Sequence, residues 1–178
     1  MLESSAFDDY LRCVNQDDLY QEATGAYGAA LDRLARAYEA DADARRDLLQ
    51  EIHLQLWRSL GQFDQRCSLR TWVYRVAHNV ATGHVLRQRR IRKPLVSLEE
   101  IESMPGSDPG ELAAGKDKAI ERLSMLIQRL KPLDRQIIVS YLEGMDAAST
   151  GEITGLSPAN VAMKIHRIKI ILTRWFHE

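Results

Sequence analysis

Residues 157 to 174 read SPANVAMKIHRIKIILTR, and this stretch carries two faces of opposite chemistry on one predicted helix. Its apolar side chains recur at steps of four, three and four residues, at Val161, Ile165, Ile168 and Leu172. That spacing places them in one stripe of an α-helix, where they are expected to be buried. The opposite face consists of Ala159, Met163, His166, Arg167, Ile170 and Arg174, with Asn160 and Lys164 beside it. Because the stretch holds no acidic residue, we expect this second face to point outward and to be positively charged.

The residues before this helix predict a helix-turn-helix. Ser157 is a good N-cap acceptor, and Pro158 takes the first helical position, where its missing N–H costs nothing. Gly155 and Leu156 form a tight turn after a segment, residues 146–153, that is long enough for about two helical turns. The second helix of such a motif enters the DNA major groove, and its N-terminal half reaches the base edges. An ordinary αα-hairpin with a solvated basic face is the alternative.

Length and composition favour a folded protein of the cytoplasm. The chain has 178 residues, of which 45% are hydrophobic, enough for one or two domains with buried cores. It has no apolar run of about 18 residues and no basic-then-apolar leader after Met1. The cysteines are Cys13 and Cys67 alone, without CxxC or HExxH spacing. We therefore expect no metal site and no cofactor.

The formal net charge of −1 is unevenly distributed along the chain. Residues 1–22 hold six acids and one cation, and residues 99–117 again hold six acids and one cation. In contrast, residues 87–93 contain five cations in seven positions, and residues 164–174 contain four. Some of these cations complement the negative end of a helix dipole, and charge runs are often merely solvated surface. Five exceed what a helix terminus needs, so we predict that residues 87–93 follow a phosphate backbone.

The spacing of apolar residues predicts an all-α fold with two small helical domains. The predicted helices before the one at 158–174 span residues 19–38, 44–60, 69–90, 116–130, 133–143 and 146–153. Residues 94–115 are rich in Pro, Gly, Ser and acids and have no sustained period, which is typical of a flexible linker. We therefore divide the chain into a tail (1–18), a first domain (19–93), the linker and a second domain (116–178). Gly151 lies inside the first helix of the motif at a cost of about 0.5–1 kcal/mol relative to Ala, so we expect that helix to be short or mobile.

The order of these parts resembles the bacterial group IV, or extracytoplasmic-function, RNA polymerase sigma factors. In the first domain the resemblance rests on Asp47-Leu-Leu-Gln-Glu51 with Leu56-Trp57, on Phe63-Asp64, on residues 68–79 (SLRTWVYRVAHN) and on the basic run. In the second domain it rests on Leu130-x-Pro132-x-x-Arg135, on Tyr141-Leu-Glu-Gly144 and on residues 155–161 (GLSPANV) with Arg167. Arg46 departs from the family, which often has an acid there.

The resemblance implies a non-enzymatic factor that makes core RNA polymerase promoter-specific. Its region 2-like first domain, a bundle of three to four helices, would bind the polymerase and would read and open the −10 element, and its region 4-like second domain would read the −35 element. The matching positions for docking on the coiled coil of the polymerase β′ subunit are Asp47, Gln50, Glu51 and Trp57. Those for the −10 element are Asp64, Gln65, Arg66, Cys67, Ser68, Arg75, Asn79, His84, Arg87, Arg89 and Arg90, with Trp72 and Tyr74 equally plausible as core residues. Those for the −35 element are Ser157, Asn160, Met163, Lys164, His166 and Arg167.

The implied partners are core RNA polymerase, through its β′ and β subunits, promoter DNA and an anti-sigma factor, with no small-molecule substrate. Two other classes are open at this point. A stand-alone helix-turn-helix regulator that binds duplex DNA as a dimer would explain the second domain but leave the first without a role. An enzyme with Cys67 as nucleophile would need a histidine with an orienting acid, and no such context is recognisable in the sequence.

Overall fold

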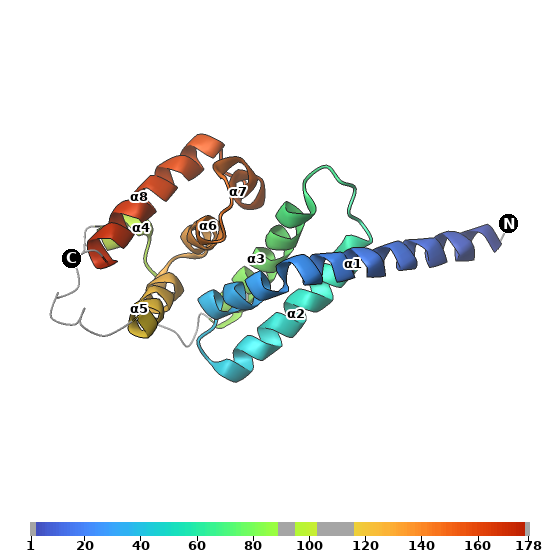
Figure 1. Cartoon of the computed structure of the whole chain (residues 1–178), viewed down its shortest axis with the longest axis horizontal. Helices are drawn as coiled ribbons and strands as arrows, with labels where there is room; N and C mark the ends of the chain where they lie inside the picture. The colour runs from blue at the N-terminus through green and yellow to red at the C-terminus, as the bar shows by residue number, and fades with distance from the viewer. Residues whose placement is uncertain (1–2, 89–94, 103–115, 177–178) are drawn as a thin grey trace.

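The computed structural model describes residues 3–88, 95–102 and 116–176, and these residues form α-helices joined by short turns (Figure 1). The helices are α1 (Glu3–Tyr38), α2 (Ala42–Leu60), α3 (Leu69–Gln88), α4 (Leu98–Glu102), α5 (Lys116–Arg129), α6 (Pro132–Leu142), α7 (Ala147–Thr154) and α8 (Pro158–Phe176). The prediction of an all-α chain is confirmed. Among the described helices, none is both long enough and apolar enough to cross a membrane.

The first domain is built from α1, α2 and α3, which pack against one another along their lengths (Figure 1). The apolar stripes predicted for these helices supply its core, including Leu31, Leu34, Leu48, Ile52 and Leu56, all at most 1% exposed. Asp41 caps α2 by accepting hydrogen bonds from the backbone N–H groups of Asp43 and Ala44. This satisfies two donors that the helix itself leaves without partners.

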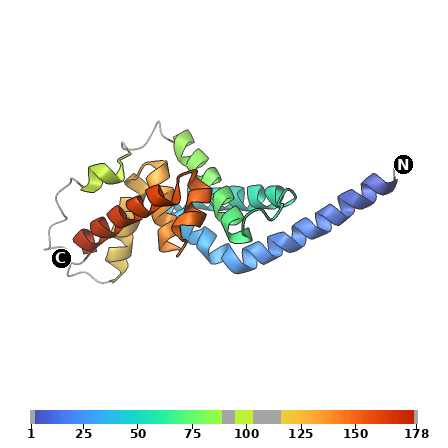
Figure 2. The same cartoon turned by 90° about the horizontal axis from the view of Figure 1, so that it is seen from above.

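The N-terminal residues differ from the predicted tail. α1 begins at Glu3 and continues without a break to Tyr38, so that its first half projects away from the rest of the molecule (Figure 2). Where α1 leaves the rest of the molecule it still contacts α2. Asp17 Oδ1 accepts a hydrogen bond of 2.7 Å from Trp57 Nε1. The side-chain amide of Gln16 also donates to the carbonyl of Trp57, at 2.6 Å. Gln16 and Asp17, at the end of the predicted tail, therefore contact the first domain.

The second domain contains α5 to α8, with the predicted helix-turn-helix in α7 and α8. Asp146 caps α7 by accepting a hydrogen bond from the N–H of Ser149, and Gly155 ends it in the left-handed conformation at φ 77°. α7 is short, with eight residues, as expected for a helix that contains Gly151. A Cβ added there would lie 2.7 Å from the carbonyl oxygen of Leu156, so Gly151 allows the turn to approach the helix closely.

Part of the predicted linker is ordered on the second domain. Val96 forms a parallel bridge with Leu130, and α4 follows it directly. Ser97 and Glu100 form a capping box, because the N–H of each lies within hydrogen-bonding distance of the side chain of the other. Leu98 and Ile101 are 1% and 2% exposed. This two-residue apolar pattern is too short to show as a period in the sequence, which explains why α4 was not predicted.

The two domains pack directly on each other. α1 and α3 contact α5, α6 and α7 (Figure 1). This packing explains why α3 is buried on more than one side. The buried residues of α3 include Tyr74 and His78 in addition to Val73 and Val85, because α3 packs against α1 and α2 and also against α6 and α7 of the second domain.

Candidate nucleic-acid interface

α8 presents the two faces that its sequence predicted. Val161 and Ile168 are fully buried, Ile165 and Leu172 are half-buried, and Ile171 is also buried. On the other side Asn160, Met163 and His166 are exposed, with Met163 at 62%. Ser157 caps the helix by accepting a hydrogen bond from the N–H of Asn160, at 3.3 Å. The exposed N-terminal half of α8 therefore has the composition and position of a recognition helix.

Two cations of the same helix are engaged by acids instead of facing solvent. Lys164 Nζ lies 2.7 Å from Asp134 Oδ1 of α6 and 3.4 Å from Glu99 Oε1 of α4. Arg167 Nη1 forms an ion pair with the same oxygen of Glu99. The backbone N–H of Glu99 and these two cations hold the pKa of the Glu99 carboxyl below its usual range. Both cations are thus neutralised locally, in contrast to the expectation of a free basic face.

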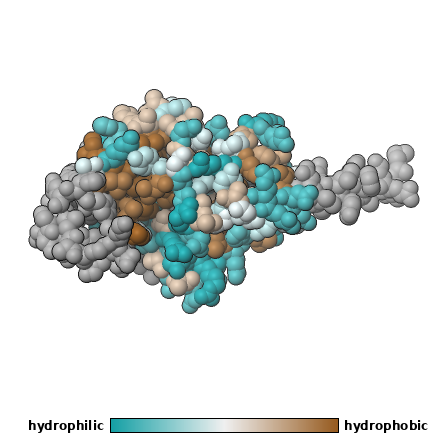
Figure 3. Space-filling view, viewed as in Figure 1, coloured by the Kyte–Doolittle hydropathy of each residue, from teal (hydrophilic) through white to brown (hydrophobic). Residues whose placement is uncertain are grey.

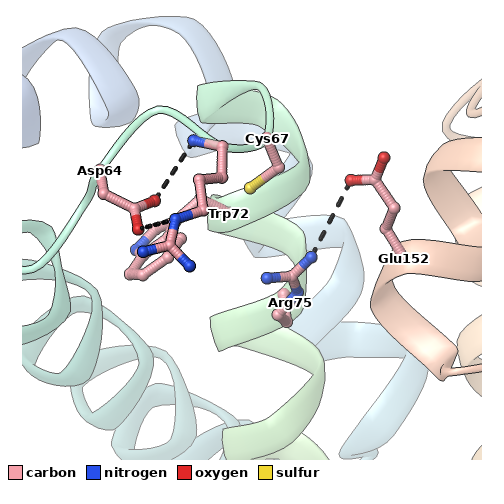
Figure 4. A pocket seen from close by; sticks show the side chains of 6 residues that line it. Asp64, Cys67, Trp72, Arg75 and Glu152 are labelled. Atoms are coloured by element: carbon pink, nitrogen blue, oxygen red, sulfur yellow. Dashed lines mark hydrogen bonds and ion pairs between the residues drawn. The ribbon is translucent and has the colours of Figure 1, made fainter.

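The loop between α2 and α3 opens onto a cavity of about 460 Å³ (Figure 4). The residues that line the cavity are Asp64, Arg66, Cys67, Trp72, Arg75 and Glu152. Asp64 organises the loop, because its carboxylate accepts from the backbone N–H of Arg66 and pairs with the guanidinium of Arg66 at 2.7 Å. Gln65 adopts a positive φ of 61°, a strained conformation of the kind that concentrates at binding sites.

The cavity lies between the two domains. Arg75 projects from α3 and Glu152 from α7, and their charged groups are 3.9 Å apart (Figure 4). Trp72 forms one wall, with its ring 5.4 Å from that of Phe63 and its Nε1 donating to Ser59 at 3.0 Å. An aromatic wall, a cation and polar loop atoms around a space of this size suit an unstacked base.

The other residues of the predicted −10 surface differ in their surroundings. Asn79 is exposed and Arg87 pairs with Glu51 of α2 at 3.0 Å. The side chain of His84 is 11% exposed, and its Nε2 lies 2.8 Å from the fully buried carboxylate of Glu39. This histidine thus satisfies a buried acid, and its contact with the −10 element stays a prediction. Arg89 and Arg90 lie outside the described residues.

The exposed side of α2 carries the positions predicted for polymerase docking. Asp47 and Gln50 are exposed, and Glu51 is partly exposed beside Arg87. Trp57 is 37% exposed, and its Nε1 donates a hydrogen bond to Asp17 of α1. An exposed tryptophan with polar neighbours is typical of the anchor of a protein interface.

Glu143 is the centre of the contact between the domains, and sequence reasoning did not identify this role. Arg33 of α1 donates to both carboxylate oxygens of Glu143, at 2.7 Å each, and the Tyr74 hydroxyl donates to one of them at 3.1 Å. Arg70 donates to the Glu143 backbone carbonyl. The hydrogen bond from Arg33, followed by its charge, lowers the pKa of Glu143. The partners lie far away in the chain, so no local pattern indicates them.

His78 is buried beside this contact. Its Nδ1 lies 2.9 Å from the Tyr38 hydroxyl, and its Nε2 lies 3.3 Å from the hydroxyl of Ser140 on α6. Arg135 of α6 lies over the Tyr38 ring at 5.1 Å. Complete burial lowers the pKa of His78 to about 3. A neutral imidazole thus fills the space between the two domains.

Both halves of the chain match models of known protein families. Residues 24–91 match the model of "Sigma-70 region 2", and residues 120–172 match that of "Sigma-70, region 4". The first match covers α2, the cavity loop and α3, and the second covers the helix-turn-helix.

The curated relatives carry related names. The chain is 25% identical to the RNA polymerase sigma factor CnrH of Cupriavidus metallidurans over 165 residues, which is 86% of this chain and 84% of that protein. It is 32% identical to the RNA polymerase sigma-H factor of Pseudomonas aeruginosa over 68% of this chain and 62% of the relative. The match to the ECF RNA polymerase sigma-E factor of Escherichia coli is 30% over 65% of this chain and 59% of the relative.

A solved structure shares the fold. The structure of CnrH in complex with the cytosolic domain of CnrY superposes with a TM-score of 0.61 and 18% identity, over 92% of this chain and 91% of that one.

Proposed function

The chain belongs to the extracytoplasmic-function group of sigma-70 factors, which direct RNA polymerase to promoters, and we propose how its two domains divide that work. The observation that carries the proposal is the presence of both sigma regions, in order, on one chain whose second domain contains a helix-turn-helix. The first domain binds the polymerase and opens the −10 element. The second domain reads the −35 element as intact duplex.

The −35 readers are the residues on the N-terminal half of α8. Ser157, Asn160, Met163 and His166 are exposed there, and Lys164 and Arg167 stand on the flank of the same helix. Arg167 has the fork geometry for bidentate hydrogen bonds to a guanine, whereas Lys164 acts as a point charge toward phosphate. Met163 contributes apolar contact, which suits a thymine methyl group.

The −10 readers surround the cavity of the first domain. We propose that a base of the melted strand enters the space beside Trp72, where residues 64–68 supply hydrogen bonds. Asn79 and Arg87 lie further along α3 and are assigned to the strand and its phosphates, together with Arg89 and Arg90 of the basic run. His84 stays in this set as a prediction, although its Nε2 pairs with Glu39 inside the domain.

The polymerase anchor in this proposal is Trp57, with Asp47, Gln50 and Glu51 as its polar rim. These residues follow one another along the outer side of α2, opposite the buried Leu48, Ile52 and Leu56. The arrangement fits a coiled coil of the β′ subunit, because an exposed helix with one aromatic anchor packs readily against another helix. A stand-alone dimeric regulator would have no use for this surface, and the region 2 match argues against it.

A protein that holds the factor inactive completes the proposed set of partners. The solved structure with the same fold is itself a complex, of CnrH with the cytosolic domain of CnrY. On this chain Met163 and Ile170 expose 62% and 42% of their surface on α8, and an apolar area is visible over the second domain in Figure 3. An anti-sigma protein that covers α8 would prevent −35 binding. Because a sigma factor acts on promoter DNA, we propose that the chain functions in the cytoplasm.

The division of labour is tested with two substitutions in the full chain. Trp57→Ala is expected to weaken capture of core polymerase in a pull-down by at least about tenfold, as removal of an interface hot spot does. Arg167→Gln is expected to leave capture unchanged and to lower promoter-dependent run-off transcription. Lys169→Gln is the matched control, because it removes the same charge from α8 at an exposed position that lies over the Tyr141 ring. If Trp57→Ala and Arg167→Gln impair the same step, the proposed division is incorrect.

A further inference from the structure

The acidic helix α4 occupies the flank of the helix that is assigned to the −35 element. Glu99 Oε1 lies 3.4 Å from Lys164 Nζ and forms an ion pair with Arg167. These two are the cations on the DNA-reading half of α8. A carboxylate that accepts hydrogen bonds from Lys164 and Arg167 occupies the same donors that a phosphate or a guanine edge would use.

α4 is held in this position by apolar, hydrogen-bonding and ionic contacts with the second domain. We call the surface that makes these contacts the seat of α4. The side chains of Leu98 and Ile101 are buried against the second domain. The N–H of Leu98 donates to Asp134 Oδ2 at 3.0 Å, and the other oxygen of Asp134 pairs with Lys164. Val96 is bridged to the chain at Leu130 through two backbone hydrogen bonds of 2.8 Å. Glu100 pairs with Lys131 at 3.2 Å.

The seating of α4 also limits the length of chain that connects the two domains. With Val96 bridged to Leu130, only residues 89–95 connect α3 to the second domain, and seven residues span at most about 25 Å. With α4 released, the connection consists of residues 89–115, and 27 residues span up to about 90 Å. Release of α4 therefore removes Glu99 from both cations, although Lys164 keeps its ion pair with Asp134 of α6, and it lengthens the tether between the domains.

We propose that α4 is an intramolecular competitor of promoter DNA, which leaves its seat on α8 when the helix binds duplex. The inference rests on the assignment of α8 as the DNA-reading helix. α4 has five residues and contributes two buried apolar side chains, Leu98 and Ile101, so its release costs the second domain little of its own core. The free factor is thus restrained from binding DNA by its own linker, and DNA affinity reflects the fraction of molecules in which α4 is released.

Glu99→Gln in the full chain is the first test. It removes the pairing with Lys164 and Arg167, and affinity for a fluorescently labelled mixed-sequence duplex at low salt is expected to rise about threefold to tenfold in an anisotropy titration. Glu100→Gln is the matched control. It makes the same charge change on the same helix, and glutamine still serves in the capping box. Its ion pair with Lys131 is about half exposed on both sides, so we expect its loss to weaken the seat of α4 little. Equal gains for Glu99→Gln and Glu100→Gln would overturn the proposal.

Arg167→Gln separates failure of this inference from failure of the proposed function. If α8 reads DNA, Arg167→Gln lowers the affinity for the duplex, and the gain from Glu99→Gln becomes smaller in the double variant. If Arg167→Gln has no effect on duplex binding, the assignment of α8 itself is incorrect. If it lowers affinity while Glu99→Gln has no effect, only the role of α4 is refuted.

Hydrogen exchange of the wild-type chain gives an independent readout. The amides of Leu98 and Ile101 are hydrogen-bonded in the seat, to Asp134 and to the Ser97 carbonyl. We expect them to be protected in the free chain and to lose protection when the mixed-sequence duplex is added at saturating concentration. Retention of protection in the DNA complex would show that α4 stays seated and would overturn the proposal.

Discussion

His78 makes the free energy of unfolding of the chain dependent on pH. Its ring is fully buried between Tyr38 of the first domain and Ser140 of the second, and the pKa of about 3 is well below the value near 6.5 in an unfolded chain. The folded-state pKa is the lower one, so the unfolded chain takes up a proton below pH 6.5 while the folded chain does not. Stability is therefore complete above pH 6.5 and falls as the pH is lowered from there toward 3.

The expected size of this effect follows from the linkage relation. Each pH unit below 6.5 costs about 1.4 kcal/mol, so lowering the pH from 7 to 5 removes about 2 kcal/mol through His78 alone. The assay is urea unfolding of the full chain at both pH values, followed by far-UV circular dichroism.

His78→Gln is the comparison that isolates this residue. Glutamine retains an amide that can hydrogen-bond to Tyr38 or Ser140 but does not titrate. The variant is expected to be less stable at both pH values and to lose about 2 kcal/mol less than the wild type on acidification. Other groups, such as His53, whose pKa burial also lowers, contribute equally to both proteins. The same acid-induced loss in both would refute the assignment of a neutral, buried His78.

Three further predictions concern the contact between the domains and the helix-turn-helix. Glu143→Gln removes the carboxylate that accepts two hydrogen bonds from Arg33. Because Arg33 is 59% exposed, we expect the contact between the two domains to lose only about 1 kcal/mol. The loss would be visible as a larger radius of gyration in small-angle X-ray scattering. Because the pKa of Glu143 is lowered by Arg33, the same contact is complete above the ordinary carboxyl pKa and is lost as the pH falls through the lowered value; a radius that is unchanged both by the substitution and by acid would argue against this role. Gly151→Ala places a Cβ 2.7 Å from the Leu156 carbonyl oxygen and is expected to lower the free energy of unfolding by about 1–3 kcal/mol, measured by thermal unfolding. Gly28→Ala has open space in α1 and is expected to raise the free energy of unfolding by about 0.5–1 kcal/mol. Equal effects would mean that the turn does not need the glycine. Asp146→Ala removes the cap of α7 and is expected to lower stability by about 1 kcal/mol, while Asp146→Asn, which retains the acceptor oxygen, loses much less; identical losses would contradict the capping role.

Local patterns in the sequence were sufficient for the helices and for the helix-turn-helix. The stripe of Val161 and Ile168, the cap at Ser157 and the turn at Gly155 each depend on residues within a few positions of one another, and the structure has all of them. The order of the motifs was sufficient for the family, which the matches to regions 2 and 4 confirm. The roles of individual site residues stay predictions that the experiments above address.

The tertiary structure decided which charged and polar residues are engaged. His84 carries no mark in the sequence that pairs it with Glu39, and Arg33 and Glu143 are 110 positions apart. Likewise, a segment rich in Pro, Gly and acids predicted a linker, whereas the seat formed by α6 and α8 orders residues 95–102 within it. The physical reason is that helix periodicity is a short-range property, while ion pairing and burial depend on which helices the folded chain brings together.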